Sequence, residues 1–458
     1  MLIRGPILNP RPDGSVDFIP DGALASAEDG TRIKYASPWA SFGPSSEQFE
    51  TAHGILCPAF LDNHIHIPQH PIRGRFTEGI DAHPPEGRLI AGLNRNVFPA
   101  EARCEEPHYT AKVVSDFLED TWAHGVIGGA AYMTVHTAAA RTALEVLPGT
   151  WFVGPVLMNM NCPEYLRTDE RTWARDVELL AKDFGRRVIV TDRFAVAVDS
   201  RLRQEAVALA RQLGLRMQTH LNEQIREKRF VEHELYPGAG TYTGVYERDG
   251  LLDCEPILAH CVRMSGDEFQ SVGRHSGAQI AHCPTSNTLL GSGVMPLDRL
   301  FEHGIEYAIC TDVGASPTTS LLCEMAQFLK VHSGISPRAT PLEALYRTTL
   351  GAAKMLGLDR VLGSFDPGKA MTFIEIDCRT DGIEGMSVDR VIAERVLEMS
   401  PALSADVSRA LEVLRAYGLE DGPEMTVLQR DFDETMRRLD RKVRRVVVEG
   451  REVWRDFR

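Results

Sequence analysis

From residue 54 onward, short apolar segments alternate with amphipathic ones, and this alternation limits the possible folds more than any other feature. Helical periodicity runs through 109–123, 172–184, 199–214 and 265–277, and a short β-branched or apolar run follows each of them. Strands that alternate with helices indicate parallel pairing through helical crossovers. We therefore predict the α/β class for this part of the chain.

Polar residues that can bind a metal ion follow several of the apolar runs. His64 and His66 come after the run 54–61, and residues two apart in a strand point to the same side, so both imidazoles can bind one ion. Single polar residues stand at similar strand ends later in the chain, namely His220, His260 and Asp312. Functional residues spread over several strand ends are typical of a (β/α)8 TIM-type barrel, which is the fold that we predict.

Three imidazole nitrogens and one carboxylate oxygen suit a divalent ion that keeps a position open for water. We predict one such ion, zinc by default with iron or manganese also compatible, held by His64, His66, His220 and Asp312. Metal binding lowers the pKa of water from about 16 toward about 7. No lysine lies between Lys182 and Lys228, where a bridging lysine of a two-metal site would stand, and this favours a single ion.

Two residues complete the expected chemistry. Glu223 follows His220 by three residues, and a carboxylate there can take a proton from the water and pass it to a ring nitrogen. The alternative is a solvated glutamate at a helix start, where negative charge is favoured. His260 either adds a ligand or hydrogen-bonds to the metal-bound water. The predicted catalytic residues are therefore Glu223, His260 and Asp312.

The two chain ends differ from the middle. Residues 1–55 contain short alternating segments broken by turn residues, and 443–454 has the pattern of a hairpin. We expect 1–55 and 367–458 to form one small β-sandwich-like domain, with the barrel, 56–366, inserted between its halves. The segment 386–440 is charged and helix-periodic, so we expect helices there that belong to the small domain and serve packing or subunit contact.

Composition narrows the partners and the compartment. A formal net charge of −14 disfavours binding to a nucleic-acid polymer or an anionic membrane. The nine cysteines include no C-x-x-C pair, which indicates reduced thiols and excludes the zinc deaminases that use P-C-x-x-C. The N-terminus has no signal-peptide pattern and no segment is apolar enough to span a membrane. We expect a cytoplasmic protein with a small-molecule substrate, and a homodimer as the commonest symmetric assembly.

Longer motifs resemble the amidohydrolase superfamily, and within it the guanine deaminases, over about residues 54–377. The motifs are Pro58-Ala-Phe-Leu-Asp-Asn-His-Ile-His-Ile-Pro-Gln, Val97-Phe-Pro-Ala-Glu, Thr191-Asp-Arg-Phe, Thr219-His-Leu-Asn-Glu, Tyr242-Thr-Gly-Val-Tyr, Leu290-Gly-Ser-Gly and Thr311-Asp-Val-Gly. The resemblance implies metal-dependent hydrolytic deamination of an aminated heterocycle, guanine to xanthine and ammonia. It also implies that Gln69 pairs with the polar edge of the purine, Arg193 donates to its carbonyl oxygen, and Phe194 packs on the ring.

The segment 87–94 departs from this pattern. Guanine deaminases carry Leu-Glu-Trp-Leu there as a wall of the substrate pocket, whereas this chain has Gly87-Arg-Leu-Ile-Ala-Gly-Leu-Asn. The sequence therefore leaves guanine, another purine and a pterin as alternative substrates. Another amidohydrolase reaction, such as triazine or halide hydrolysis, is also an alternative. A non-enzymatic barrel is a further alternative, against which the complete set of metal-binding residues argues.

Overall fold

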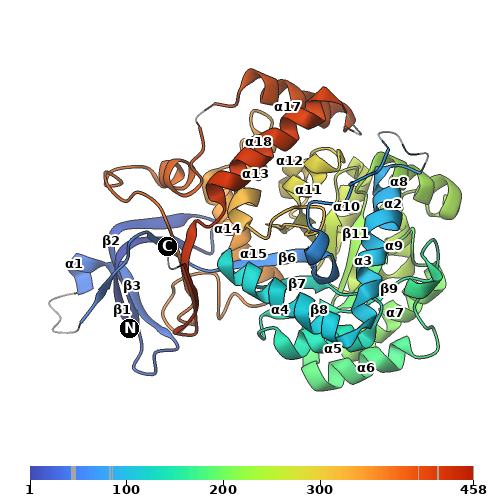
Figure 1. Ribbon diagram of the computed structural model, residues 1–458, viewed down its shortest axis with the longest axis horizontal. Coiled ribbons are helices and arrows are strands. Elements are labelled where there is room, and N and C mark those ends of the chain that lie inside the picture. Colours follow the sequence, from blue (N-terminus) through green and yellow to red (C-terminus); the bar gives the residue numbers. More distant parts are fainter. Residues whose placement is uncertain (43–47, 82–83, 85, 401, 420–421, 457–458) are drawn as a thin grey trace.

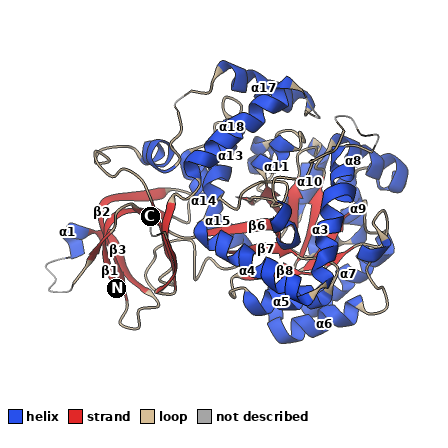
Figure 2. Ribbon diagram, viewed as in Figure 1, coloured by secondary structure: helices blue, strands red, loops and turns tan. Residues whose placement is uncertain are grey.

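A computed structural model describes residues 1–42, 48–81, 84, 86–400, 402–419 and 422–456 (Figure 1). A β-rich part built from the two ends of the chain lies beside a larger part in which helices surround strands (Figure 2). Both chain ends lie in the β-rich part (Figure 1).

The larger part contains parallel strands in two hydrogen-bonded series, β6-β7-β8 and β14-β13-β12-β11-β10-β9. Their bounds are β6 Phe60–His66, β7 Val126–Tyr132, β8 Trp151–Gly154, β9 Val156–Leu157, β10 Val190–Phe194, β11 Met217–Leu221, β12 Ile257–His260, β13 Gln279–His282 and β14 Tyr307–Ile309. A parallel bridge between Val153 and Val188 and the pairing of β9 with β10 connect the two series. The short strands β8 and β9 follow each other along the chain, so the strands occupy eight successive positions.

The two ends of this strand series meet through backbone hydrogen bonds. Beyond β14, the amide of Asp312 donates to the carbonyl of His64 over 2.9 Å, and the amide of His66 donates to the carbonyl of Val313 over 2.7 Å. These bonds connect the segment after β14 to β6, the first strand of the series. The predicted (β/α)8-type architecture is confirmed, and the joined ends carry three of the predicted metal ligands.

Helices cover the outside of the strand series (Figure 2). They are α4 Pro107–Ala123, α5 Thr137–Val146, α6 Trp173–Phe184, α7 Ser200–Leu213, α9 Tyr242–Asp249, α10 Gly266–Arg274, α12 Leu297–Glu302, α13 Leu321–His332, α14 Pro341–Thr348 and α15 Leu350–Leu356. The helices predicted over 109–123, 172–184, 199–214 and 265–277 correspond to α4, α6, α7 and α10. Local capping sets their ends: Ser265 and Glu268 form a capping box at the start of α10.

Short helices lie mostly in the loops between strands and major helices. They are η1 Ile67–Ile72, α2 Arg88–Gly92, η2 Leu93–Val97, α3 Phe98–Ala102, η3 Arg103–Glu105, η4 Glu164–Leu166, η5 Gly185–Arg187, α8 Ile225–Phe230, η6 Val231–Leu235, η7 Pro237–Ala239, η8 Leu251–Asp253 and α11 Pro284–Leu289. Within the described ranges, no helix has the length and apolar character needed to cross a bilayer. Loop helices that follow barrel strands are the usual place for functional residues in this architecture.

The β-rich part is an eight-stranded sheet with the order β17-β16-β15-β5-β1-β2-β3, and β4 pairs with β1. Its elements are β1 Leu2–Pro10, β2 Val16–Ser26, β3 Ile33–Pro38, α1 Trp39–Phe42, β4 Glu50–Thr51, β5 Ile55–Cys57, β15 Phe373–Ile376, β16 Val443–Val448 and β17 Arg451–Arg455. Strands from the two ends of the chain meet within this sheet, because β5 pairs with β15 of the C-terminal half on one side and with β1 on the other. The hairpin predicted at 443–454 is formed by β16 and β17.

The apolar run 54–61 forms two strands, and not the single strand that its composition predicts. β5 belongs to the eight-stranded sheet, whereas β6 begins at Phe60 and is the first strand of the barrel. Pro58 lies between them, and proline has no N–H group with which to continue a strand ladder. One apolar run therefore connects the two parts of the molecule and leads directly to His64 and His66.

The segment 386–440 is mainly helical, as predicted, and comprises α16 Val388–Arg390, η9 Val391–Val396, α17 Ala405–Tyr417 and α18 Pro423–Leu439. An apolar cluster joins α17 and α18 to Val331 of α13, and the ammonium of Lys330 lies 2.5 Å from a carboxylate oxygen of Asp431. The amide of Leu419 donates to the carbonyl of Gly291 over 2.9 Å. The helical pair therefore contacts barrel elements, including the loop after β13.

Candidate active site and metal centre

The four residues predicted as metal ligands come together at one end of the strands. Nε2 of His64 and Nε2 of His66 lie 3.2 Å and 3.1 Å from Oδ1 of Asp312. Nε2 of His220 lies 3.2 Å from Nε2 of His66. One ligand atom from each of these residues lies within 4.8 Å of all the others. The spacing is that of atoms arranged around a single ion.

The hydrogen-bonding state of the imidazoles fits a metal ion. Nδ1 of His64 and Nδ1 of His66 are buried and have no hydrogen-bond partner among the described residues, and such groups are costly unless something binds them. Nδ1 of His220 donates to the carbonyl of Arg193 over 2.6 Å, so the lone pair of His220 is on Nε2, which faces the other ligands. The nitrogen atoms that could hold an ion are therefore directed toward the centre of the cluster.

The charge state of the cluster also suits a divalent cation. Burial lowers the pKa of His64 to about 4 and that of His220 well below its usual value, so both rings are neutral at pH 7. Although burial opposes ionisation of Asp312, hydrogen bonds from His64 and His66 hold the pKa of its carboxyl well below its usual range. Neutral imidazoles and an ionised carboxylate are the protonation states that metal binding requires.

Several residues of this site have a left-handed backbone conformation. Asp312, His260 and Asn222, which precedes Glu223, have φ values of 57°, 71° and 53°, in the left-handed region that non-glycine residues seldom adopt. Ser286 supports Asp312 from outside the cluster, because its hydroxyl donates to Oδ2 over 2.7 Å. Strained residues held by their surroundings are characteristic of functional sites.

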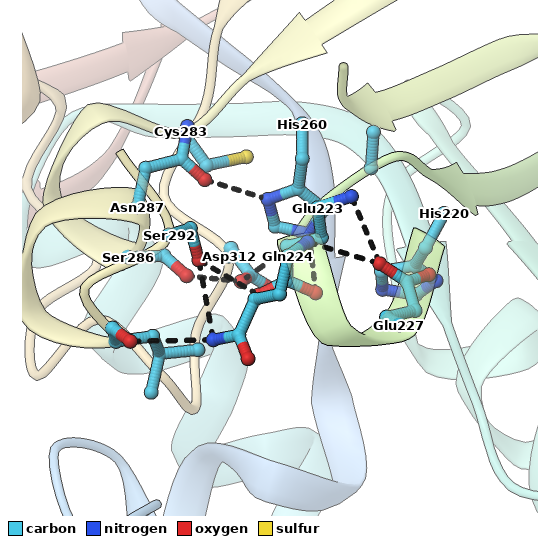
Figure 3. Close-up of polar contacts among 12 residues, drawn as sticks. His220, Glu223, Gln224, Glu227, His260, Cys283, Ser286, Asn287, Ser292 and Asp312 are labelled. Atoms are coloured by element: carbon cyan, nitrogen blue, oxygen red, sulfur yellow. Dashed lines mark hydrogen bonds and ion pairs between the residues drawn. The ribbon is translucent and has the colours of Figure 1, made fainter. Parts of the chain in front are cut away.

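Glu223 and His260, both predicted as catalytic, lie beside His220 and Asp312 of the cluster (Figure 3). Nε2 of His260 is 3.7 Å from Oε2 of Glu223 and 3.9 Å from Oδ2 of Asp312. Burial, and then the negative charge of Asp312, raise the pKa of Glu223 to about 8. A carboxyl group with that pKa can both accept and donate a proton near neutral pH.

A cavity opens beside these groups. It brings the predicted substrate contacts Gln69, Arg193 and Phe194 to the same space as the predicted catalytic groups. The complete lining is His66, Gln69, Phe76, Leu89, Leu93, Arg193, Phe194, His220, Glu223, His260, Leu290 and Asp312.

The segment 87–94 does contribute a wall to this cavity. Leu89 and Leu93 line it together with Phe76, although the tryptophan and glutamate typical of guanine deaminases are absent. The two leucines are four residues apart in consecutive helical turns, and residues at that spacing share a helix face. Comparison with the family motif showed that the tryptophan and the glutamate are absent, but it did not show that Leu89 and Leu93 line the cavity in their place.

Sequence reasoning gave no role to Glu101, although it lies in the motif Val97-Phe-Pro-Ala-Glu. Its carboxylate accepts a 2.9 Å hydrogen bond from Nε2 of Gln69 and bonds of 3.0 Å and 2.7 Å from Nη1 of Arg193. Membership of a motif was the only sequence signal, because 92 residues separate Glu101 from Arg193. The structure therefore adds a buried carboxylate behind two predicted substrate contacts.

Two tyrosines of α9 explain the motif Tyr242-Thr-Gly-Val-Tyr246. The hydroxyl of Tyr242 donates to Glu227 over 2.8 Å, and Glu227 accepts the amide hydrogen of Glu223 over 2.9 Å. The hydroxyl of Tyr246 donates to the carbonyl of His220 over 3.0 Å. Both ends of the segment that carries His220 and Glu223 are therefore fixed from the same helix.

Parallel strands with helical crossovers, and a cluster of histidines and aspartate at the strand ends, define a metal-dependent hydrolase of the (β/α)8 type. The model of the Amidohydrolase family matches residues 55–452, and the chain belongs to this family. The match begins at β5 and extends into β17, so it includes the entire candidate site.

Individual relatives confirm the predicted resemblance to guanine deaminases. A probable guanine deaminase of Deinococcus radiodurans is 32% identical over 427 residues, which cover 88% of this chain and 90% of the relative. The guanine deaminase of Escherichia coli K12 is 29% identical over 392 residues, 82% of this chain and 85% of the relative. The solved structure of E. coli guanine deaminase superposes with a TM-score of 0.77 at 25% identity and covers 99% of each chain.

Proposed function

We propose that the protein catalyses the hydrolytic deamination of guanine to xanthine and ammonia, and thus belongs among the hydrolases of carbon–nitrogen bonds. One observation carries this proposal. A single cavity is lined by three of the four predicted metal ligands, by the buried acid Glu223, and by Gln69, Arg193 and Phe194. The similarity to guanine deaminases over most of the chain supports guanine as the ring.

We assign one divalent ion to His64, His66, His220 and Asp312. Three imidazoles and a carboxylate favour zinc, and the same donor set also accepts iron or manganese. When bound, such an ion supplies a water of lowered pKa as a nucleophile at neutral pH. Tyr132 packs against three of the ligand rings at centroid distances of 4.5–4.9 Å and helps to fix their orientation.

The protein groups move two protons while one bond forms and another breaks. The water oxygen bonds to C2 of guanine, and Glu223 takes the first proton of the water and delivers it to the adjacent ring nitrogen N3. Asp312 takes the second proton and passes it to the amine, the C2–amine bond breaks, and ammonia leaves. His260, 3.7 Å from Glu223 and 3.9 Å from Asp312, is placed to hold the attacking water between them.

The remaining residues orient the ring. Arg193 donates to the carbonyl oxygen of the purine and Gln69 pairs with the same polar edge. Phe194, which is 5% exposed, packs on the ring, and Leu89 and Leu93 cover its apolar surface. A site that hydrogen-bonds a substrate group rejects rings that lack this group, because its buried polar atoms then stay unpaired.

A substrate panel tests the proposal. Metal-replete protein is incubated with guanine, 8-oxoguanine, adenine, isoxanthopterin and a chlorotriazine, and ammonia and chloride are measured. Ammonia from guanine, with the other rings slow, is the expected result. Ammonia from the pterin with guanine inert would contradict the substrate and keep the reaction, whereas chloride release without any ammonia would contradict deamination itself.

The assembly and location of the protein belong to the same proposal. The nine cysteines are free, eight of them buried and Cys162 half-buried, which is compatible with a reducing compartment. We infer a cytoplasmic enzyme that forms a symmetric homodimer, acts on a small heterocycle and binds neither nucleic-acid polymers nor membranes. We keep 1–55, 56–366 and 367–458 as the proposed domain boundaries.

A further inference from the structure

Glu101 is a fully buried carboxylate for which the mechanism above has no use. It lies in α3, and its side chain is 1% exposed and pairs with Arg193, whose side chain is 3% exposed. Ion pairs buried to this degree lose much hydration energy and add little stability relative to apolar residues. Because both of its partners, Gln69 and Arg193, line the substrate cavity, the more informative question is what the carboxylate does to them.

Glu101 fixes the orientation of the Gln69 amide. A carboxylate only accepts hydrogen bonds, so the atom 2.9 Å from it is the amide nitrogen of Gln69. On the other side, the amide of Gly314 points at Oε1 of Gln69 over 3.4 Å. If the Gln69 amide were rotated by 180°, its oxygen would face the Glu101 carboxylate and its NH₂ group would face the N–H of Gly314, and both contacts would be repulsive. The side chain of Gln69 therefore keeps its oxygen as the acceptor that a ligand meets.

Gly314 allows this orientation by its small size. A Cβ atom at position 314 would lie 2.9 Å from Cβ and 3.3 Å from Oε1 of Gln69, closer than such atoms normally approach. The backbone at position 314 can therefore approach Gln69 this closely only because the residue has no side chain. Glu101 and Gly314 together hold the amide from its two ends.

Glu101 also selects which donors Arg193 offers. Both carboxylate oxygens bind Nη1 of Arg193, at 3.0 Å and 2.7 Å, and the guanidinium carbon lies 5.1 Å from the ring of Phe98 in the same helix as Glu101. No hydrogen bond from Nε or Nη2 of Arg193 to another described residue is found. Because the guanidinium is planar and its donors are fixed relative to one another, these two nitrogens remain for a ligand.

We propose that Glu101 is a specificity-determining residue. By orienting its two partners, it gives one edge of the cavity a hydrogen-bond acceptor, Oε1 of Gln69, next to a hydrogen-bond donor, the guanidinium of Arg193. The chemical group that complements this edge is a ring lactam, in which an N–H donor stands next to a C=O acceptor. An amino-substituted ring reverses both partners: its amine faces Arg193 and its bare ring nitrogen faces Oε1. The inference rests on the proposed function, since it names the part of guanine that the site recognises.

The test compares guanine with 2,6-diaminopurine, which keeps the reacting 2-amino group and exchanges the lactam for an amino edge. In Glu101→Gln, residue 101 can donate as well as accept, so the Gln69 amide is free to turn. We expect kcat/KM for guanine to fall about 100-fold, mostly through KM, while the value for 2,6-diaminopurine changes less than about five-fold. Glu105→Gln is the matched control, because Glu105 is exposed and lies four residues along the chain.

A binding measurement separates this inference from the proposed function. Hypoxanthine has the lactam and adenine the reversed edge, and neither carries the 2-amino group, so their affinities measure the edge without turnover. We expect wild-type protein to prefer hypoxanthine, and Glu101→Gln to lose that preference while metal content stays unchanged. A preference that persists in Glu101→Gln would overturn the role of Glu101 whatever the activity on guanine. If Glu101→Gln does not fold, the same two ligands are compared on Glu101→Asp, whose shorter side chain keeps the charge but moves it away from Gln69. Loss of the preference for hypoxanthine in Glu101→Asp would then support the role of Glu101, and a preference that persists would overturn it.

Discussion

His260 donates its Nδ1 proton to Oδ1 of Asn287 over 2.9 Å, and this bond keeps Nε2 facing Glu223 and Asp312 (Figure 3). The amide oxygen only accepts hydrogen bonds, so the tautomer of His260 is determined by Asn287. Nε2 is buried and has no partner among the described residues. The ring is therefore held with Nε2 available to a water or a substrate group.

Replacing Asn287 with alanine should lower kcat by roughly 10- to 100-fold, the usual effect of removing a group that orients a site residue. The ring of His260 would no longer be fixed in one tautomer, while the four predicted metal ligands stay in place. Steady-state kinetics and metal analysis on the same sample check this. Asn94→Ala is the control, since Asn94 is exposed. Unchanged kcat in Asn287→Ala would show that the tautomer of His260 is irrelevant.

The substitution Glu223→Gln should leave metal content unchanged and reduce kcat by about 10²- to 10⁴-fold, the range expected for a proton-transferring group. Glutamine keeps the shape of the side chain but cannot carry the proton from the water to the ring nitrogen. The exposed Glu234 provides the control variant Glu234→Gln, which should behave as wild type. Turnover retained in Glu223→Gln would remove Glu223 from the mechanism.

Metal removal should abolish turnover and destabilise the fold. Without an ion, several buried imidazole nitrogens have no partner and the carboxylate of Asp312 lacks its cation. An ion at 100 to 1,000 times its dissociation constant stabilises the folded state by about 2.7–4 kcal/mol. Chelation followed by addition of zinc, iron or manganese, with Tm and ammonia release recorded, measures both effects. Full activity after complete chelation would rule out the metal-dependent mechanism.

Stability should depend on pH through His124, which is not among the residues of the candidate site. Although burial opposes its protonation, a 3.0 Å hydrogen bond to Asp440 and the charge of Asp120 raise the pKa of His124. A raised pKa adds stability that is present below the unfolded pKa of about 6.5 and is lost as pH rises through the folded pKa.

The His124→Gln variant should therefore be less stable than wild type by about 1 kcal/mol at pH 5.5, with the difference shrinking at pH 8.5; the value is modest because Asp440 is 44% exposed. Midpoints of urea unfolding at the two pH values report this change. His108→Gln is the control, because His108 is exposed. A difference that grows toward high pH would contradict the assignment.

The predicted metal ligands and catalytic residues could be found from the sequence because parallel strands bring their carboxyl ends to one place. His220 and His260 stand within or at the end of apolar strands, so periodicity alone suggested that they meet. Glu101 could not be found in this way, since it lies in a short helix whose contacts depend on tertiary packing. The same holds for Phe76, which lines the cavity from a loop without periodicity.

The residues at which a strand begins and ends could not be predicted where one apolar run contributes to two different sheets. The run 54–61 is uniformly apolar, and nothing in its composition shows that Ile55–Cys57 belongs to one sheet and the residues from Phe60 onward to another. Pro58 marks the change, but proline also occurs at the edges of single strands. Likewise, helical periodicity located α17 and α18, yet their contact with α13 is a property of the folded chain.

The stoichiometry of guanine turnover by the metal-replete enzyme tests the proposed reaction most directly. Guanine is added in limiting amount, and xanthine and ammonia are quantified in the same reaction. We expect one xanthine and one ammonia for each guanine consumed, and no product from protein stripped of metal. Guanine left intact by fully metal-loaded, folded protein would contradict the assignment of guanine deamination to this site.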